Sequence, residues 1–395
     1  MNRPGKDSGR PANLAAALVL VFVLGGAAAA AGAPIRSSYN ARITADEPEY
    51  LLTAMSLGED RSLDVSDEIA ERRYRPFHEV VLDPQAKRLE GGRMVSPHDP
   101  LLPALLVPGT LAGGWLGAKL TLSAMAGVLA ALLLWTAVRR FDLPVWRSAL
   151  VVGVFATSAP FAVYGSQIYP ELPAAIAVTV AIACITGPLR WRGLAGLVVS
   201  IVALAWLGTK FLPVGAVLGA LPLWRMLRAG RRREVAAVCA AFAVAGAGYL
   251  AGHLRWYGDL TVYATGEFFA ETGQFSVVGV TPDYADRTSR LIGLLVDRRF
   301  GLAAWQPAWL LLAPAAAWVA FRRPANWAVL ILPLSIGWLA ATYLALTMHG
   351  WWWPGRQLVA VLPAAVLAIA WWAGSPRRGA AVGVLGAVGV FNLAW

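Results

Sequence analysis

Charged residues are scarce in this sequence. Asp, Glu, Lys and Arg together make up 14% of the 395 residues, whereas 58% are hydrophobic and the mean hydropathy is +0.57. A soluble globular domain has about 25% charged residues, so this composition excludes that class and favours a protein that lives in a bilayer. The chain therefore has to be interpreted with the bilayer as its solvent.

Cysteine and histidine are scarcer still, with two and four copies. Their spacing fits no cysteine- or histidine-based metal motif. Cys184 and Cys239 both lie in apolar stretches, where a small buried hydrophobic residue is the expected role and a disulfide is not. A function built on disulfides or on a cysteine-bound metal is therefore not expected.

Long apolar runs are abundant. A helix that crosses the hydrocarbon core needs about 20 mostly apolar residues, because no water is present there to satisfy its backbone. The sequence thus predicts an all-α polytopic membrane protein, a single domain over 1–395 with about eleven transmembrane helices. The predicted spans are 13–33, 116–138, 146–164, 170–187, 193–208, 210–226, 235–254, 301–321, 326–347, 354–373 and 379–395.

Two stretches do not fit this pattern simply. The stretch 100–114 is apolar, but it is short and is broken by Pro103, Pro108 and a glycine pair, so we expect an interfacial or re-entrant segment there. The last span is cut off at Trp395 without a tail. Either that helix is short or the sequence is a C-terminally truncated fragment.

The distribution of basic residues predicts the orientation. Lys and Arg are retained preferentially in short cytoplasmic loops, and an N-terminus on the inside places half of the 34 basic residues in inner segments with only three acids, Asp7, Asp142 and Glu234. The net charge of +11 therefore indicates orientation and contact with anionic lipid, not nucleic-acid binding. The basic N-terminus and the apolar run behind it also resemble a secretory signal, and with or without cleavage the next loop lies outside.

Two outer loops are long, 34–100 and 255–300, and function concentrates in loops of this kind. The first contains the acidic motif Asp46-Glu47 and, directly after it, a stretch from Pro48 to Leu57 with apolar residues on one side. This pattern predicts a short amphipathic helix on the bilayer surface. Such a helix would fix both acids at the boundary between water and lipid.

Each acidic or histidine candidate has a structural alternative. Asp46 and Glu47 fit a helix N-cap and a first-turn acid, and Glu171 fits an acid at a helix start. His98, which precedes Asp99-Pro100, fits a turn. A capping role does not exclude a catalytic one.

The basic candidates lie on the side where positive charge is disfavoured. Lys210 stands alone between two apolar spans, Arg298 and Arg299 precede an outer helix start, and Arg356 follows His349 and a run of three tryptophans. Lys210 could be a snorkelling anchor and the tryptophans an interfacial belt. Alternatively, these basic side chains bind a negatively charged group.

One chemistry accounts for carboxylates and cations at the outer leaflet of a protein with no nucleotide-binding loop. It is the transfer of a sugar from a lipid phosphate to an acceptor. Arg and Lys hold the phosphate and stabilise it as it leaves. Because phosphate leaves readily, one carboxylate that takes the proton of the acceptor hydroxyl is sufficient.

Several motifs also occur in a familiar order, and with them the chain resembles the bacterial membrane glycosyltransferases of the GT-C fold. That family includes relatives of the protein O-mannosyltransferases and of the aminoarabinose transferase that acts on lipid A. The resemblance spans residues 1 to about 375. Its motifs are Asp46-Glu47-Pro48-Glu49-Tyr50, Ser96-Pro97-His98-Asp99-Pro100, Ile168-Tyr169-Pro170-Glu171, Thr209-Lys210, Asp297-Arg298-Arg299-Phe300-Gly301 and Trp353-Pro354-Gly355-Arg356.

The resemblance implies a multi-pass enzyme of the bacterial inner membrane that uses a polyprenyl-phosphate sugar at its outer face. It assigns the general base to Asp46, and acceptor positioning or a cation contact to Glu47. The donor phosphate is assigned to Lys210, Arg298, Arg299 and Arg356. Sugar contact, or a divalent cation that some related enzymes use, is assigned to His98, Tyr169, Glu171 and His349.

The chain departs from the family at two positions. Glu49 stands where relatives commonly have histidine, and Asp99 stands where they have glycine before proline. These departures leave the sugar and the acceptor open: a hydroxyl, amine or phosphate of an envelope lipid, glycan or protein.

Two other classes of function were weighed. A transporter or flippase for lipid-linked sugars predicts charge pairs deep within the spans and internal repeats, and the sequence shows neither. A purely structural assembly partner leaves the outer carboxylates and arginines unexplained.

Overall fold

The computed structural model describes residues 11–36, 41–260, 283–345, 348 and 354–395. These residues form a bundle of helices. The only strands among them are β1 (Lys87–Arg88) and β2 (Met94–Val95), an antiparallel pair in the first loop with Lys87 opposite Val95. The predicted all-α class is therefore confirmed for the described part of the chain.

Each predicted span contains or overlaps a helix, but the predicted spans 146–164, 301–321 and 354–373 differ from the observed bounds. Their bounds are α1 (Pro11–Gly32), α2 (Glu47–Glu59), α3 (Ser66–Ala70), α4 (Leu101–Arg140), α5 (Val145–Ala156), α6 (Phe161–Tyr164), α7 (Glu171–Ile185), α8 (Trp191–Leu207), α9 (Leu212–Arg228), α10 (Arg232–Tyr257), α12 (Tyr284–Arg287), α13 (Arg290–Val296), α14 (Leu312–Arg322), α15 (Trp327–Tyr343), α16 (Leu362–Trp372) and α17 (Pro376–Ala394). Short 3-10 turns are η2 (Glu90–Gly92), η3 (Thr209–Phe211), η4 (Pro307–Leu311) and η6 (Arg356–Leu358).

Four helical segments among the described residues are long and apolar enough to cross a bilayer: Ala12–Gly32, Leu101–Arg140, Thr209–Arg228 and Arg232–Tyr257. Shorter apolar helices, among them α7, α8 and α15, accompany them. These helices are compatible with a polytopic membrane protein. The count of eleven spans and the inward N-terminus stay predictions.

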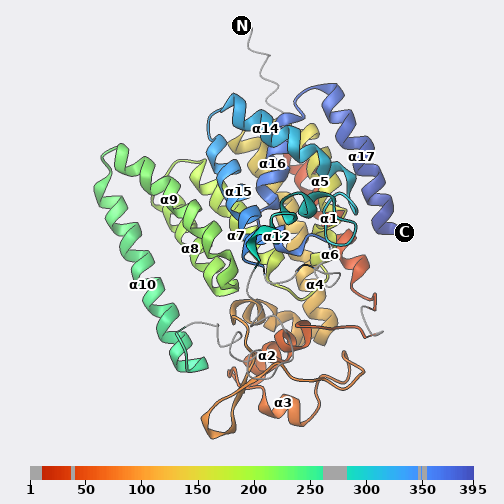
Figure 1. The fold of residues 1–395 in the computed structure, drawn as a ribbon, viewed down its shortest axis with the longest axis vertical. Helices are drawn as coiled ribbons and strands as arrows, with labels where there is room; N and C mark the ends of the chain where they lie inside the picture. The colour runs from red at the N-terminus through yellow and green to blue at the C-terminus, as the bar shows by residue number, and fades with distance from the viewer. Residues whose placement is uncertain (1–10, 37–40, 261–282, 346–347, 349–353) are drawn as a thin grey trace.

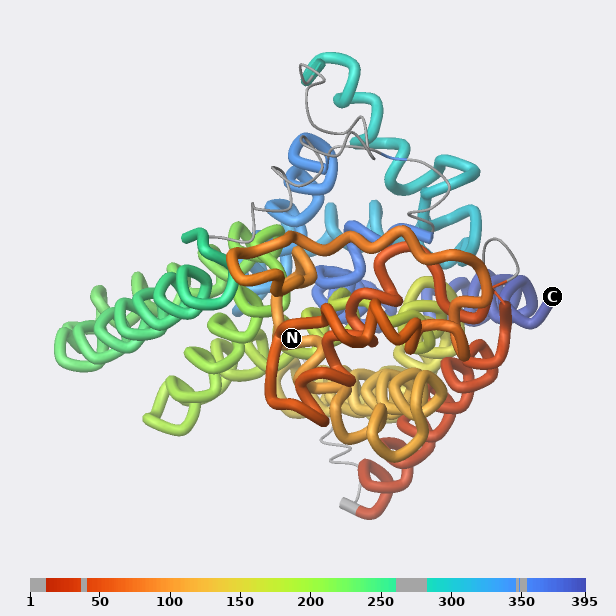
Figure 2. The backbone as a smooth tube through the Cα atoms, turned by 90° about the horizontal axis from the view of Figure 1, so that it is seen from below, coloured from red at the N-terminus to blue at the C-terminus, as the bar shows by residue number. Residues whose placement is uncertain are grey.

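The first loop gathers at one end of the bundle. Figure 1 shows α2 and α3 at the end opposite to the start of α1, below the long helix α4, with α10 along one flank. The view from that end in Figure 2 shows the loop crossing the ends of several helices. Of the second predicted outer loop, residues 261–282 lie outside the described residues.

The stretch 100–114 does not continue straight into the following span. Within α4 the chain leaves helical geometry at Gly113 (φ −153°, ψ 22°) and Gly114 (φ 57°, ψ −142°). The backbone of Gly109 then lies directly against that of Gly117, which a straight helix could not bring together over eight residues. The segments 101–112 and 115–140 thus form a helical hairpin, and the interfacial or re-entrant position of the first arm stays a prediction.

This close approach yields a stability prediction. Replacing Gly117 with alanine would drive its Cβ into the carbonyl oxygen of Gly109, and overpacking of this kind destabilises by about 1–3 kcal/mol. We expect a lower melting temperature in thermal unfolding of the purified protein. Gly246→Ala in α10 is the matched control, because a Cβ there meets nothing within 4 Å. Equal melting temperatures for both variants would contradict the hairpin.

The interfacial position predicted for the helix after Asp46 is wrong. The helix forms as α2, but every residue from Glu47 to Ala54 is buried, so no face is left for lipid headgroups. One flank is covered by the α4 hairpin, because Gly58 packs against Val107 and Leu111. Gln85 of the first loop and Ile168 before α7 donate backbone hydrogen bonds to Glu49 and Glu47, contacts that the local apolar pattern could not reveal.

Candidate active site

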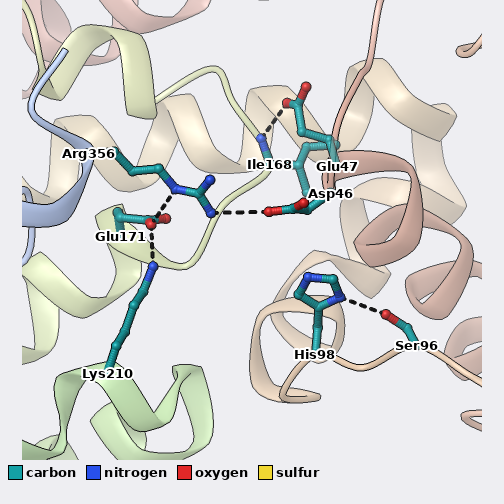
Figure 3. Close-up of polar contacts among 8 residues, drawn as sticks. All are labelled: Asp46, Glu47, Ser96, His98, Ile168, Glu171, Lys210 and Arg356. Carbon is teal, nitrogen blue, oxygen red and sulfur yellow. Dashed lines mark hydrogen bonds and ion pairs between the residues drawn. The ribbon is translucent and has the colours of Figure 1, made fainter. Parts of the chain in front are cut away.

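Two basic side chains from distant parts of the chain bind the same buried carboxylate, that of Glu171. Glu171 begins α7, Lys210 lies in η3 and Arg356 begins η6. The Oε1 atom of Glu171 accepts hydrogen bonds from Lys210 Nζ at 2.6 Å and from Arg356 Nε at 2.7 Å (Figure 3). Because the Glu171 side chain is only 1% exposed, these contacts supply the compensation that a buried charge requires.

Asp46 joins the group through the same guanidinium. It occupies the N-cap position of α2, yet its side chain makes no capping hydrogen bond. Its Oδ2 atom instead lies 3.4 Å from Arg356 Nη2. Arg356 is therefore held between two carboxylates, as Figure 3 shows, and the capping alternative does not describe the Asp46 side chain.

The aromatic surroundings fix Arg356 in place. Its guanidinium carbon lies 3.8 Å from the ring centroid of Tyr169, a cation–π contact. The ring of Tyr50 meets that of Tyr169 edge-on at 6.4 Å and that of His98 at 4.5 Å. Gly355, with φ at +61°, donates its N–H to the carbonyl of Phe300 at 3.0 Å and so turns the chain into η6.

Glu47 has a different environment from Asp46. Its side chain is buried, and its two carboxylate oxygens accept backbone N–H groups, from Ile168 at 2.8 Å and from Thr44 at 3.2 Å. Glu47 thereby ties the start of α2 to the loop that leads to Tyr169 and Glu171. The structure gives it a positioning contact, and direct contact with an acceptor stays a prediction.

His98 also lies beside the cluster. Its Nδ1 atom is 2.9 Å from Ser96 Oγ, and burial lowers its pKa, which favours the neutral imidazole at pH 7. The next residue, Asp99, receives hydrogen bonds from His253 at 3.1 Å and Tyr249 at 3.3 Å, both in α10. Sequence reasoning missed His253, whose only signal was a lone histidine inside an apolar span.

The remaining basic candidates are not drawn into the cluster. Among the described residues, no hydrogen bond or ion pair joins the side chains of Arg298 or Arg299 to it. Both instead line a hollow of about 390 Å³ with Asp297, Phe300 and Met348. The backbone of this segment does touch Gly355, so both arginines stay predictions as phosphate ligands. His349 lies outside the described residues.

Accessibility differs sharply within the cluster. The side chains of Glu171 and Arg356 are 1% and 5% exposed, whereas those of Asp46 and Lys210 are 20% and 39% exposed. A molecule that approaches from the loop side would therefore meet a carboxylate and an ammonium. The buried pair holds both of them in position from behind.

A large cavity lies next to this region. It has a volume of about 890 Å³ and lies between the first loop, the start of α4, α8 and α10. Val198, Val199 and Val202 of α8 form part of an apolar wall. Arg61, Arg93 and Arg255 line it as well, and none of these arginines is ion-paired among the described residues.

Comparison with known proteins gives one structural likeness. No family model matches the sequence, and no curated protein matches it. Among solved structures, the oligosaccharyltransferase of Archaeoglobus fulgidus, crystallised in complex with Zn and sulfate, resembles this chain with a TM-score of 0.48 at 14% identity. The likeness covers 95% of this chain and 52% of that one, so the chain spans about half the length of the archaeal protein.

Proposed function

We propose that the protein is a membrane glycosyltransferase that moves a sugar from a polyprenyl-phosphate donor to a cell-envelope acceptor at the outer face of the bacterial inner membrane. The observation that supports it is that the pair formed by Glu171 and Arg356 holds two more accessible charges, Lys210 on Glu171 and Asp46 on Arg356. The acceptor group is a hydroxyl, amine or phosphate of a lipid, glycan or protein.

In the proposed reaction, the acceptor oxygen attacks the anomeric carbon while the bond from that carbon to the phosphate oxygen breaks. The leaving polyprenyl phosphate takes the electron pair of that bond, and the proton of the acceptor hydroxyl passes to Asp46. Lys210 uses one hydrogen bond for Glu171 among the described residues, and an ammonium has three N–H donors. It therefore has donors left for the developing negative charge on the phosphate.

The cavity beside α8 and α10 suits a lipid substrate. Its apolar wall fits hydrocarbon, and Arg61, Arg93 and Arg255 supply positive charge for a phosphate head. Trp206, which lines it, lies with its ring 5.3 Å from that of His253, and His253 binds Asp99 beside His98. This continuity favours a lipid-linked donor over a soluble sugar nucleotide.

The proposal is tested with purified protein in lipid nanodiscs and a panel of radiolabelled polyprenyl-phosphate sugars. We expect one donor to release polyprenyl phosphate, and Lys210→Gln to lower kcat/KM for that donor about tenfold, because a charge-assisted hydrogen bond to the leaving phosphate contributes about 1.4 kcal/mol or more. Lys87→Gln is the control, since Lys87 binds Asp259 at a similar 2.7 Å away from the cluster. Failure of every donor to react, while donor crosses the bilayer of liposomes that contain the protein, would favour the transporter instead.

A further inference from the structure

Three carboxylates come together at the far end of α2. Asp60 follows the last residue of α2, and Asp67 and Glu68 lie in α3. One carboxylate oxygen from each residue lies within 4.8 Å of the others. Because α2 has 13 residues, about 20 Å of helix separates this group from Asp46.

Glu68 shows that the cluster is more than a solvated acidic surface. Its side chain is 0% exposed, and neither of its carboxylate oxygens has a hydrogen-bond partner. A buried carboxylate without such partners is strongly unfavourable.

The nearest cation compensates the charge of Glu68 only in part. Arg73 Nη1 lies 3.8 Å from Glu68, but its guanidinium makes two hydrogen bonds of 2.7 Å with Glu59 instead. Asp60 and Asp67 are exposed and have no ion pair among the described residues. Glu68 therefore points into a pocket of negative charge whose other two members are open to solvent.

We propose that Asp60, Asp67 and Glu68 bind a calcium ion that clamps the end of α2 to α3. Carboxylate oxygens are the ligands that Ca²⁺ prefers, and its flexible coordination sphere of six to eight oxygens accepts water at the positions that three side chains leave open. Mg²⁺ demands stricter octahedral geometry, which suits a partly exposed site on a loop less well. The clamp would stiffen the loop that carries Asp46 at its other end.

The test is thermal unfolding of the intact protein with 5 mM CaCl₂ or with EGTA, which is independent of sugar transfer. Loop sites outside the cell bind calcium with a Kd of about 10⁻⁴–10⁻³ M, so we expect calcium to raise the melting temperature by about 2 °C. Asp67→Asn, at an exposed position, should abolish the rise without impairing folding. Asp142→Asn, the same substitution in another loop, should keep it.

Terbium luminescence supplies a second readout with wild type and the two variants. Tb³⁺ emission that calcium displaces should appear in wild type and in Asp142→Asn but not in Asp67→Asn. Equal melting temperatures of the wild type in CaCl₂ and EGTA, an equal calcium response in Asp67→Asn, or a response to MgCl₂ alone would each overturn the proposal. None of these outcomes would bear on the glycosyltransferase assignment.

Discussion

Asp46→Asn is expected to lower the rate of sugar transfer by about 10²–10⁴-fold, the usual contribution of a general base. The amide keeps the size of the side chain and its oxygen can still accept from Arg356 Nη2, which lies 3.4 Å from Asp46. It cannot take a proton from an acceptor hydroxyl. The loss should therefore fall on the chemical step while the fold is preserved.

Single-turnover release of polyprenyl phosphate from a donor that the wild type consumes measures this effect. Asp142→Asn is a matched control, since Asp142 lies in a loop with φ at 52°, a conformation that asparagine tolerates well. That control should retain full activity. A rate for Asp46→Asn within twofold of wild type would remove Asp46 from the mechanism.

Glu171→Gln is expected to have the largest effect on stability. The substitution removes the carboxylate charge that Lys210 and Arg356 share. Glu171 and Arg356 are both nearly inaccessible to water. Removing one partner of a buried ion pair destabilises a protein by about 3–5 kcal/mol. Because Lys210 is partly exposed, we expect the loss for Glu171→Gln at the lower end of that range. Thermal unfolding in detergent or nanodiscs should show a clear drop in melting temperature.

Two further variants separate charge compensation from a general loss of packing. Glu234→Gln removes the carboxylate of a partly exposed pair with Arg231, and its melting temperature should lie close to that of wild type. Adding Lys210→Met to Glu171→Gln removes the unbalanced ammonium and should recover part of the lost stability. If the double variant is no more stable than Glu171→Gln alone, the cations are not what Glu171 compensates.

The fold was largely predictable because helix length and apolar composition are local properties. The break at Gly113 was also visible, since prolines followed by a glycine pair favour an interruption of the helix. The burial of α2 was not, because the 101–112 arm of the hairpin and the segment before α7, which both contact it, lie far from it in the sequence. An apolar side facing lipid and one facing protein look the same in a sequence.

The candidate site was predictable by residue type but not by contact. Asp46, Glu171, Lys210 and Arg356 were chosen because charge is costly beside a bilayer, and the structure brings these four together. Which ones pair depends on contacts across 185 residues for Arg356 with Glu171 and 310 for Arg356 with Asp46. No local pattern encodes such separations, and the same reasoning therefore could not distinguish Arg356 from Arg298.

The position of Arg356 between two carboxylates also constrains how the protein is made. Glu171 and Lys210 are only 39 residues apart, so a growing chain can form that pair early during insertion. The guanidinium that links it to Asp46 is synthesised 310 residues after Asp46. Nascent chains released before that point would contain Asp46 and Lys210 but not Arg356, which connects them. The complete site would therefore form only at a late stage of biogenesis.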